Sequence, residues 1–211
     1  ICIDIETDGP VPGRNNMLSL AAAAYVIEEA DDDSGEMQKV MVDTFSMNLE
    51  NMEGCGPNER TMREFWDKEP EAWEAVMQDR RDPHGVMVAF VAWVHMLEAQ
   101  ESRRAVAAAY PTGFDLTWVD HYLRYYNVRG PFGFSRIDMK TLAMAWRVVT
   151  GKQIAYQGFS RKSLPERFFD DLPHTHIALD DAIEQGAMMC NLLIDLKRIQ
   201  RENQSYYSLI S

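Results

Sequence analysis

His174-Thr175-His176-Ile177-Ala178-Leu179-Asp180-Asp181-Ala182 is the most informative stretch of the chain. His176 lies five residues before Asp181, and the alanines at 178 and 182 leave room for close packing beside them. We expect a helix over residues 177–201, with Asp181 in its first turn and His176 in the loop that precedes it. On its own, the acidic pair is also typical of an ordinary helix N-terminus, where negative side chains are favoured.

A second pair of carboxylates stands at the start of the chain, in a short apolar segment that predicts a strand over residues 1–6. Residues two apart on a strand point to the same face, so Asp4 and Glu6 share one face while Ile3 and Ile5 share the other. The two carboxylates would repel each other unless a cation lay between them. Taken alone, such a pair is often only surface charge.

A further acidic position, Asp115, follows Phe114 after a predicted strand over residues 105–109 and a turn over residues 110–113. It begins a predicted helix over residues 115–126, where it could simply serve as the N-cap. Asp115 indicates a functional site only when it is considered together with the other two motifs.

Together, the three motifs resemble in order and spacing those of the DEDDh 3′→5′ exonuclease superfamily. The resemblance is carried by Asp4-Ile5-Glu6-Thr7-Asp8-Gly9, by Phe114-Asp115 and by His176-x-Ala178-x-x-Asp181-Ala182. Residues 61–66 and 163–165 resemble the phage and mycobacterial type of exonuclease and exoribonuclease in this superfamily. The resemblance spans about residues 1–195 and implies an α/β, RNase H-like fold, with a mixed β-sheet flanked by helices on both faces.

The same resemblance implies the chemistry. Asp4, Glu6, Asp115 and Asp181 would hold two Mg²⁺ or Mn²⁺ ions per site, because such hard cations prefer oxygen ligands. His176 would act as the general base, since the pKa of histidine lies near neutrality. We prefer His176 to His174 because only His176 has the five-residue spacing to Asp181.

The resemblance also implies a partner, the 3′ end of a single-stranded nucleic acid. Thr7 would face the terminal nucleotide through its backbone. Arg161 and Lys162 lie in the only locally basic, aromatic-bearing segment, residues 152–167, and would contact phosphates. This segment is alternatively a surface loop whose aromatic rings pack on the core. Many relatives carry His-Asn where this chain has residues 110–113, so the choice of RNA or DNA is not carried over, although the resemblance favours RNA.

Composition sets limits on these expectations. The 211 residues carry a net charge of −12, and −8 would remain without the four assigned carboxylates. This charge excludes a broad basic surface for nucleic acid, but it suits a metal-dependent nuclease acting on short or single-stranded ends. No apolar run approaches the roughly 18 residues of a membrane span, so we expect no membrane association. The three scattered cysteines predict free thiols and a cytoplasmic protein.

We expect a single domain over residues 1–211, with residues 202–211 as a flexible tail. A hairpin of strands over residues 18–27 and 39–49 follows the first strand. A further short strand is expected before residue 138. The other predicted helices cover residues 58–78, 83–100, 138–149 and 163–169.

Two rival functions remain open. One is a phosphodiesterase that acts on small nucleotides with the same metals. The other is a non-cutting, RNase H-like module that binds nucleic acid, which would predict a damaged metal cluster, whereas all four carboxylates and the histidine are present. Relatives are often dimers, so the resemblance allows a homodimer, although no pattern in the chain indicates one.

Overall fold

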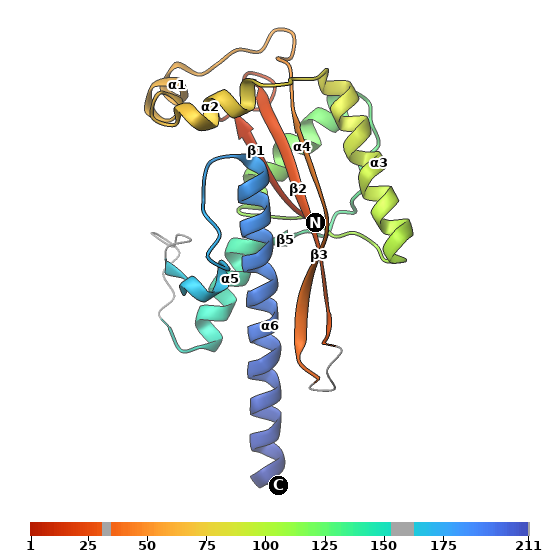
Figure 1. Ribbon diagram of the computed structural model, residues 1–211, viewed down its shortest axis with the longest axis vertical. Coiled ribbons are helices and arrows are strands. Elements are labelled where there is room, and N and C mark those ends of the chain that lie inside the picture. The colour runs from red at the N-terminus through yellow and green to blue at the C-terminus, as the bar shows by residue number, and fades with distance from the viewer. Residues whose placement is uncertain (31–34, 153–162, 211) are drawn as a thin grey trace.

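A five-stranded mixed sheet forms the centre of the structure, a computed structural model that describes residues 1–30, 35–152 and 163–210. The strand order is β3-β2-β1-β4-β5, with β1, β2 and β3 antiparallel and β4 and β5 parallel to β1 (Figure 1). The strands are β1 (Cys2–Thr7), β2 (Met17–Glu29), β3 (Met37–Asn48), β4 (Ala108–Ala109) and β5 (Ile137–Asp138). The predicted first strand, the β2–β3 hairpin and the short strand before residue 138 are confirmed.

The helices follow the predicted order with three differences, one of which is that residues 163–169, predicted as a helix, contain a 3₁₀ turn over Glu166–Phe168. The helices are α1 (Glu59–Glu64), α2 (Pro70–Met77), α3 (Pro83–Glu101), α4 (Thr112–Tyr125), α5 (Met139–Val149) and α6 (Ala178–Ile210), with 3₁₀ turns η1 (Trp66–Lys68) and η3 (Glu166–Phe168). The prediction of a single helix over residues 58–78 is wrong. The helix ends at Glu64, and a new helix, α2, begins at Pro70, which lacks an N–H and is favoured at the first helical position. The last helix continues to Ile210, through the segment predicted as a flexible tail (Figure 1). No helix in the described ranges is both long and apolar enough to cross a membrane.

Helices cover both faces of the sheet, as predicted. On one face, Ile3 and Ile5 of β1 pack with buried side chains of α3 and α4 such as Phe90 and Leu116. On the other face, α6 packs against the alanines of β2 and against α5. The alternation along β1 therefore separates an apolar face from the face that carries the carboxylates.

Small residues let α6 approach the sheet closely. Ala178 and Ala182 of the helix are buried against Ala21 and Ala23 of β2, which confirms the close packing predicted for the two helix alanines. Further along the helix, Gly186 lies so close to the sheet that an added Cβ would meet the Tyr25 ring at 2.3 Å. This contact fixes how deeply the start of α6 sits beside β1.

The burial of α6 is broader than the sequence predicted. The spacing of Ile183, Ala187, Cys190 and Ile194 by 4, 3 and 4 residues predicts one apolar stripe facing the core. In the structure, Glu184 is also fully buried and Gln185 is 6% exposed. The helix is enclosed at this level because β1, β2 and α5 pack around it. Polar side chains on α6 therefore point into the interior of the protein near the site described below.

Alanine at position 186 is expected to destabilise the fold by about 1 to 3 kcal/mol, because the new methyl group would overlap the Tyr25 ring. Gly113→Ala in α4 is the matched control, since nothing lies within 4 Å of its added Cβ. The control should gain up to about 1 kcal/mol from helix propensity. Urea unfolding of both variants measures the difference, and equal stabilities would contradict the close packing of α6.

Candidate active site

The end of β1 places two carboxylates on the sheet face that α6 covers. Asp4 and Glu6 are each 8% exposed, while Ile3 and Ile5 are buried on the opposite face, as the strand period predicted. Asp4 pairs across the ladder with Ala21, which is small and leaves the space above the strand open for α6. The strand period thus accounts for the first half of the cluster.

Two more carboxylates reach the same pocket from different helices. Asp181 lies in the first turn of α6, as predicted, and is 2% exposed. Asp115 lies in the first turn of α4 and is 4% exposed, whereas the N-cap of that helix is Pro111. The N-cap interpretation of Asp115 is therefore wrong. The pocket has a volume of about 430 Å³ and is lined by Asp4, Ile5, Glu6, Tyr110, Phe114, Asp115, His174, His176, Asp181, Gln185 and Met188.

The acidic side chains are close enough to share a cation. Asp4, Glu6 and Asp181 each offer a carboxylate oxygen within 4.8 Å of the others. Across the described ranges, no lysine or arginine forms an ion pair with these three or with Asp115. Several buried anions without basic partners are costly, so the pocket favours either bound cations or protonated carboxyl groups.

The pKa values of the buried carboxyl groups also show that negative charge is unfavourable in this pocket. Burial raises the pKa of Asp4 well above its usual range, and neighbouring carboxylates raise it further. Those carboxylates are Asp115, Glu6 and Asp181, while a hydrogen bond from Gln185 acts in the opposite direction. Burial also raises the pKa of Glu6 well above its usual range. It raises the pKa of Asp115 to about 7, although two backbone N–H groups oppose the shift.

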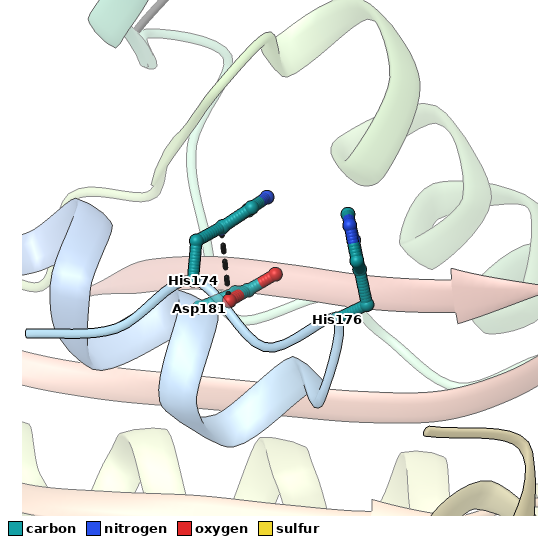
Figure 2. A group of neighbouring side chains, drawn as sticks. All are labelled: His174, His176 and Asp181. Atoms are coloured by element: carbon teal, nitrogen blue, oxygen red, sulfur yellow. Dashed lines mark ion pairs between the residues drawn. The ribbon is translucent and has the colours of Figure 1, made fainter. Parts of the chain in front are cut away.

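Two histidines flank Asp181 from the loop before α6. His174 Nδ1 lies 3.0 Å from Asp181 Oδ1 and 3.5 Å from Glu184 Oε2. Figure 2 shows the rings of His174 and His176 pointing to the same side of the loop, with Asp181 between their positions. The ring centroids are 4.7 Å apart, and the His176 ring also meets the edge of Phe65 at 5.0 Å.

The turn between the histidines is held by Thr175. Its backbone N–H donates to Asp181 Oδ1 at 3.1 Å, and its hydroxyl donates to Asp180 Oδ2 at 2.8 Å. His176 has a positive φ of 58°, a conformation that residues other than glycine rarely adopt. Surrounding contacts must hold such a residue in place, and positions of this kind concentrate at functional sites.

The sequence did not identify three residues of the pocket region. Gln185 donates from Nε2 to Asp4 Oδ1 at 2.7 Å, and Glu184 lies behind His174. Gln185 stands one helical turn after Asp181, so the spacing of four residues could have indicated it. His174 was considered only as a substitute for His176, since no spacing pointed to a contact with Asp181.

The predicted substrate-binding residues are placed less fully. Thr7 is buried at the end of β1, where its carbonyl accepts a hydrogen bond from Trp66 Nε1 at 3.0 Å. Arg161 and Lys162 lie outside the described residues. Of the same basic segment, Lys152 lies over the Trp146 ring at 4.6 Å.

Asparagine at position 115 is expected to stabilise the metal-free protein at about pH 8 but not at about pH 4. The pKa of Asp115 is about 7 in the folded chain and about 3.9 in an unfolded one. Between these values the folded state holds the extra proton, so this group's contribution to the free energy of unfolding falls as pH rises from about 4 to about 7. Asparagine removes that loss, and we expect a gain of about 1 to 3 kcal/mol above pH 7.

Urea unfolding in EDTA at both pH values measures this gain. Asp138→Asn is the control with the opposite sign. Burial alone would raise the pKa of Asp138, but hydrogen bonds from Thr141 and Thr112 lower it below its usual value. That carboxylate stabilises the fold above its unfolded pKa, so the control should lose stability at about pH 8. A gain for Asp115→Asn that is the same at both pH values would contradict the raised pKa.

Comparisons with known proteins extend over nearly the whole chain. No family model matches the sequence. The chain is 24% identical over 208 residues to the 3′-5′ DNA exonuclease Cap18 of Escherichia coli, which covers 95% of this chain and 96% of that protein. The fold is similar to the crystal structure of the nuclease domain of 3′hExo, a DEDDh family member, bound to rAMP. That match has a TM-score of 0.56 and 10% sequence identity, and it covers 92% of this chain and 90% of the other.

The order of the three motifs, the mixed sheet and the nearly full-length sequence match all indicate the same type of nuclease. The sequence similarity to the exonuclease covers 95% of the chain. The structural match shows a similar fold over most of both chains. The chain is thus similar to a 3′-5′ DNA exonuclease in sequence and to a DEDDh nuclease domain in fold, and both similarities support the resemblance to the DEDDh 3′→5′ exonuclease superfamily.

Proposed function

We propose that the chain is a divalent-metal-dependent 3′→5′ exonuclease that removes nucleotides from the 3′ end of a single-stranded nucleic acid. The observation that carries the proposal is the convergence of Asp4, Glu6, Asp115 and Asp181 with His176 around one pocket. The carboxylates come from β1, the start of α4 and the start of α6, and His176 comes from the loop before α6. Similarity to a 3′-5′ DNA exonuclease over 95% of the chain supports the proposal.

The donor set fits hard divalent cations, Mg²⁺ or Mn²⁺, with two ions per site. All four carboxylates offer oxygen, which these cations prefer. Their burial and the raised pKa values of Asp4 and Glu6 indicate a pocket that positive charge would stabilise. Asp4, Glu6 and Asp181 would hold one ion, and Asp4 with Asp115 would hold the other. Bound ions would supply positive charge against the phosphate being cleaved and lower the pKa of the attacking water.

The side chains of the protein have separate tasks in this proposal. His176 accepts the proton of the attacking water, since imidazole is the side chain that most often serves as a general base. Gln185 fixes the orientation of Asp4 through its hydrogen bond to Oδ1. Thr175 fixes Asp181 and the loop that carries His176 through its backbone N–H. The base is thereby held beside the acidic cluster.

The pocket wall suggests how the terminal nucleotide lies. Tyr110 and Phe114 line the pocket, and Phe114 is 36% exposed, so a ring is available to stack on a terminal base or sugar. The backbone of Thr7, held in place by Trp66, remains our candidate for a further contact to that nucleotide. Arg161 and Lys162 remain candidates for phosphate contacts.

A 5′-labelled single-stranded DNA oligomer, incubated with the protein and Mg²⁺, tests the proposal. DNA is the first choice because the full-length relative is named a DNA exonuclease, and an RNA of the same sequence runs in parallel. We expect a ladder that shortens from the 3′ end and disappears in EDTA. The ratio of the two digestion rates decides between DNA and RNA.

The same assay separates the rival functions. Binding without cutting would support a nucleic-acid-binding module and overturn the enzyme. Cleavage of dinucleotides or model phosphodiesters, but not of oligomers, would support a phosphodiesterase for small nucleotides. An oligomer blocked by a 3′-phosphate is the control for direction, since attack from the 3′ end should slow on it while attack from the 5′ end should not.

A further inference from the structure

A second group of metal-binding atoms lies beside the carboxylate cluster. His174, His176 and Asp181 each offer one donor atom, and these atoms lie within 4.8 Å of one another. The two rings point to the same side of the loop, and the carboxylate lies next to them (Figure 2). This group shares only Asp181 with the cluster formed by Asp4, Glu6 and Asp181.

The donor types of this group select a different class of cation. Imidazole nitrogen suits zinc, copper and nickel, whereas magnesium and calcium prefer oxygen. Two imidazoles and one carboxylate are also a common ligand set for a zinc ion that keeps a fourth position open. We propose that His174, His176 and Asp181 form a site for Zn²⁺ or a similar borderline transition metal, separate in chemistry from the carboxylate site.

Neighbouring residues support both histidines in this role. Glu184 is fully buried with Oε2 3.5 Å from His174 Nδ1, and this contact restricts the orientation of the His174 ring. Phe65 meets the His176 ring edge-on at 5.0 Å and restricts its movement. The Thr175 N–H donates to Asp181 Oδ1, which orients the third ligand.

Only a small adjustment would complete the site. Donor atoms around a tetrahedral zinc lie about 3.3 Å apart, given zinc–ligand distances of about 2.0–2.1 Å. The present separations are within 4.8 Å, and both histidines lie in the loop before α6 rather than in a helix or strand. Modest movement of that loop would therefore bring the donors together.

Zinc at this site would inhibit the nuclease. It would occupy Asp181, which the carboxylate site also needs, and it would use the His176 nitrogen that is needed to accept a proton. Binding of the two kinds of metal is therefore expected to be antagonistic. This consequence rests on the proposed function, whereas zinc binding itself does not.

Competition between the protein and a chromogenic zinc chelator, without magnesium, tests the binding directly. We expect about one Zn²⁺ per chain, bound at least about tenfold more weakly by His174→Ala and by His176→Ala. His95→Ala is the matched control, because this histidine lies on α3 and its side chain is 57% exposed. Cys55→Ser is the background for all variants, since Cys55 is a partly exposed free thiol and cysteine is a common zinc ligand.

Replacing zinc with Co²⁺ gives a spectroscopic readout of the same ligands. The wild type should show visible absorption that both histidine variants lose and His95→Ala retains. Circular dichroism confirms that each variant is folded. Zinc affinity and cobalt spectra that are the same in His174→Ala and the wild type would overturn the site.

The inhibitory consequence needs a second measurement. Zn²⁺ is titrated into the exonuclease assay at saturating Mg²⁺, and each variant is compared with its own zinc-free rate. His174→Ala should need at least about tenfold more zinc for half-inhibition, whereas equal sensitivity would overturn the inhibition. If the wild type cuts no nucleic acid, the proposed function fails while the chelator and cobalt measurements still decide the zinc site.

Discussion

Asparagine in place of Asp4 is expected to lower metal-dependent nuclease activity by at least about 10³-fold, since losing a shared metal ligand removes several kcal/mol of charge stabilisation. Three acidic neighbours, Asp115, Glu6 and Asp181, raise the pKa of Asp4 in addition to its burial. Asp4 is also the residue assigned to both ions. Single-turnover cleavage of a labelled oligomer at saturating Mg²⁺ measures the loss.

The same substitution is expected to stabilise the metal-free protein. Burial and three neighbouring anions oppose the charge on Asp4, and asparagine removes that charge while keeping an oxygen to accept the Gln185 hydrogen bond. We expect the melting temperature in EDTA to rise by roughly 3 to 10 °C. Conversely, Mg²⁺ should stabilise the wild type by binding the folded state, and should do so much less in the variant.

Asp8→Asn is the matched control for stability. Asp8 is 2% exposed and close to Asp4 in sequence, but its two carboxylate oxygens accept hydrogen bonds from the backbone and side chain of Asn16. Asparagine there replaces one acceptor with a donor, so this variant should lose stability. Full Mg²⁺-dependent activity in Asp4→Asn, or a fall in its melting temperature like that of Asp8→Asn, would contradict the shared metal site.

The sequence could place the parts of the pocket that depend on local geometry. The strand period alone puts Asp4 and Glu6 on one face, whatever sheet surrounds them. The spacing of His176 and Asp181 around a helix start is equally local. The position of Asp115 is different, because it requires β4 to lie beside β1, with Ala108 opposite Cys2. No local pattern encodes that pairing, and only the family resemblance predicted it.

Buried polar residues of α6 were harder to predict. A charged or amide side chain in a helix normally indicates the solvent face, so sequence alone does not predict that Glu184 and Gln185 are buried. They are buried because the helix begins beside the acidic end of β1, where Asp4 offers a hydrogen-bond partner to Gln185. The contact between His174 and Asp181 depends on the turn at His176, whose positive φ no sequence signal indicated.

Alanine in place of His176 is expected to lower kcat by about 10² to 10⁴, the usual effect of losing a general base. The ring lines the pocket beside the carboxylates, and its contacts to Phe65 and His174 are ring contacts. Among the described residues, no hydrogen bond or ion pair involves a His176 nitrogen, so the ring is available to accept a proton. His174 differs, because its Nδ1 lies 3.0 Å from Asp181.

Three measurements separate a lost base from a damaged site. The Mg²⁺-induced rise in melting temperature should survive in His176→Ala, since the carboxylates that hold the ions are intact. Added imidazole should restore part of the rate in His176→Ala by replacing the missing base in solution. His174→Ala is the matched variant and should lose less activity, without rescue. A rate for His176→Ala equal to that of the wild type would contradict the role of His176 as the base. Imidazole rescue only in His174→Ala would assign the proton transfer to His174, because the missing base would then be the His174 ring.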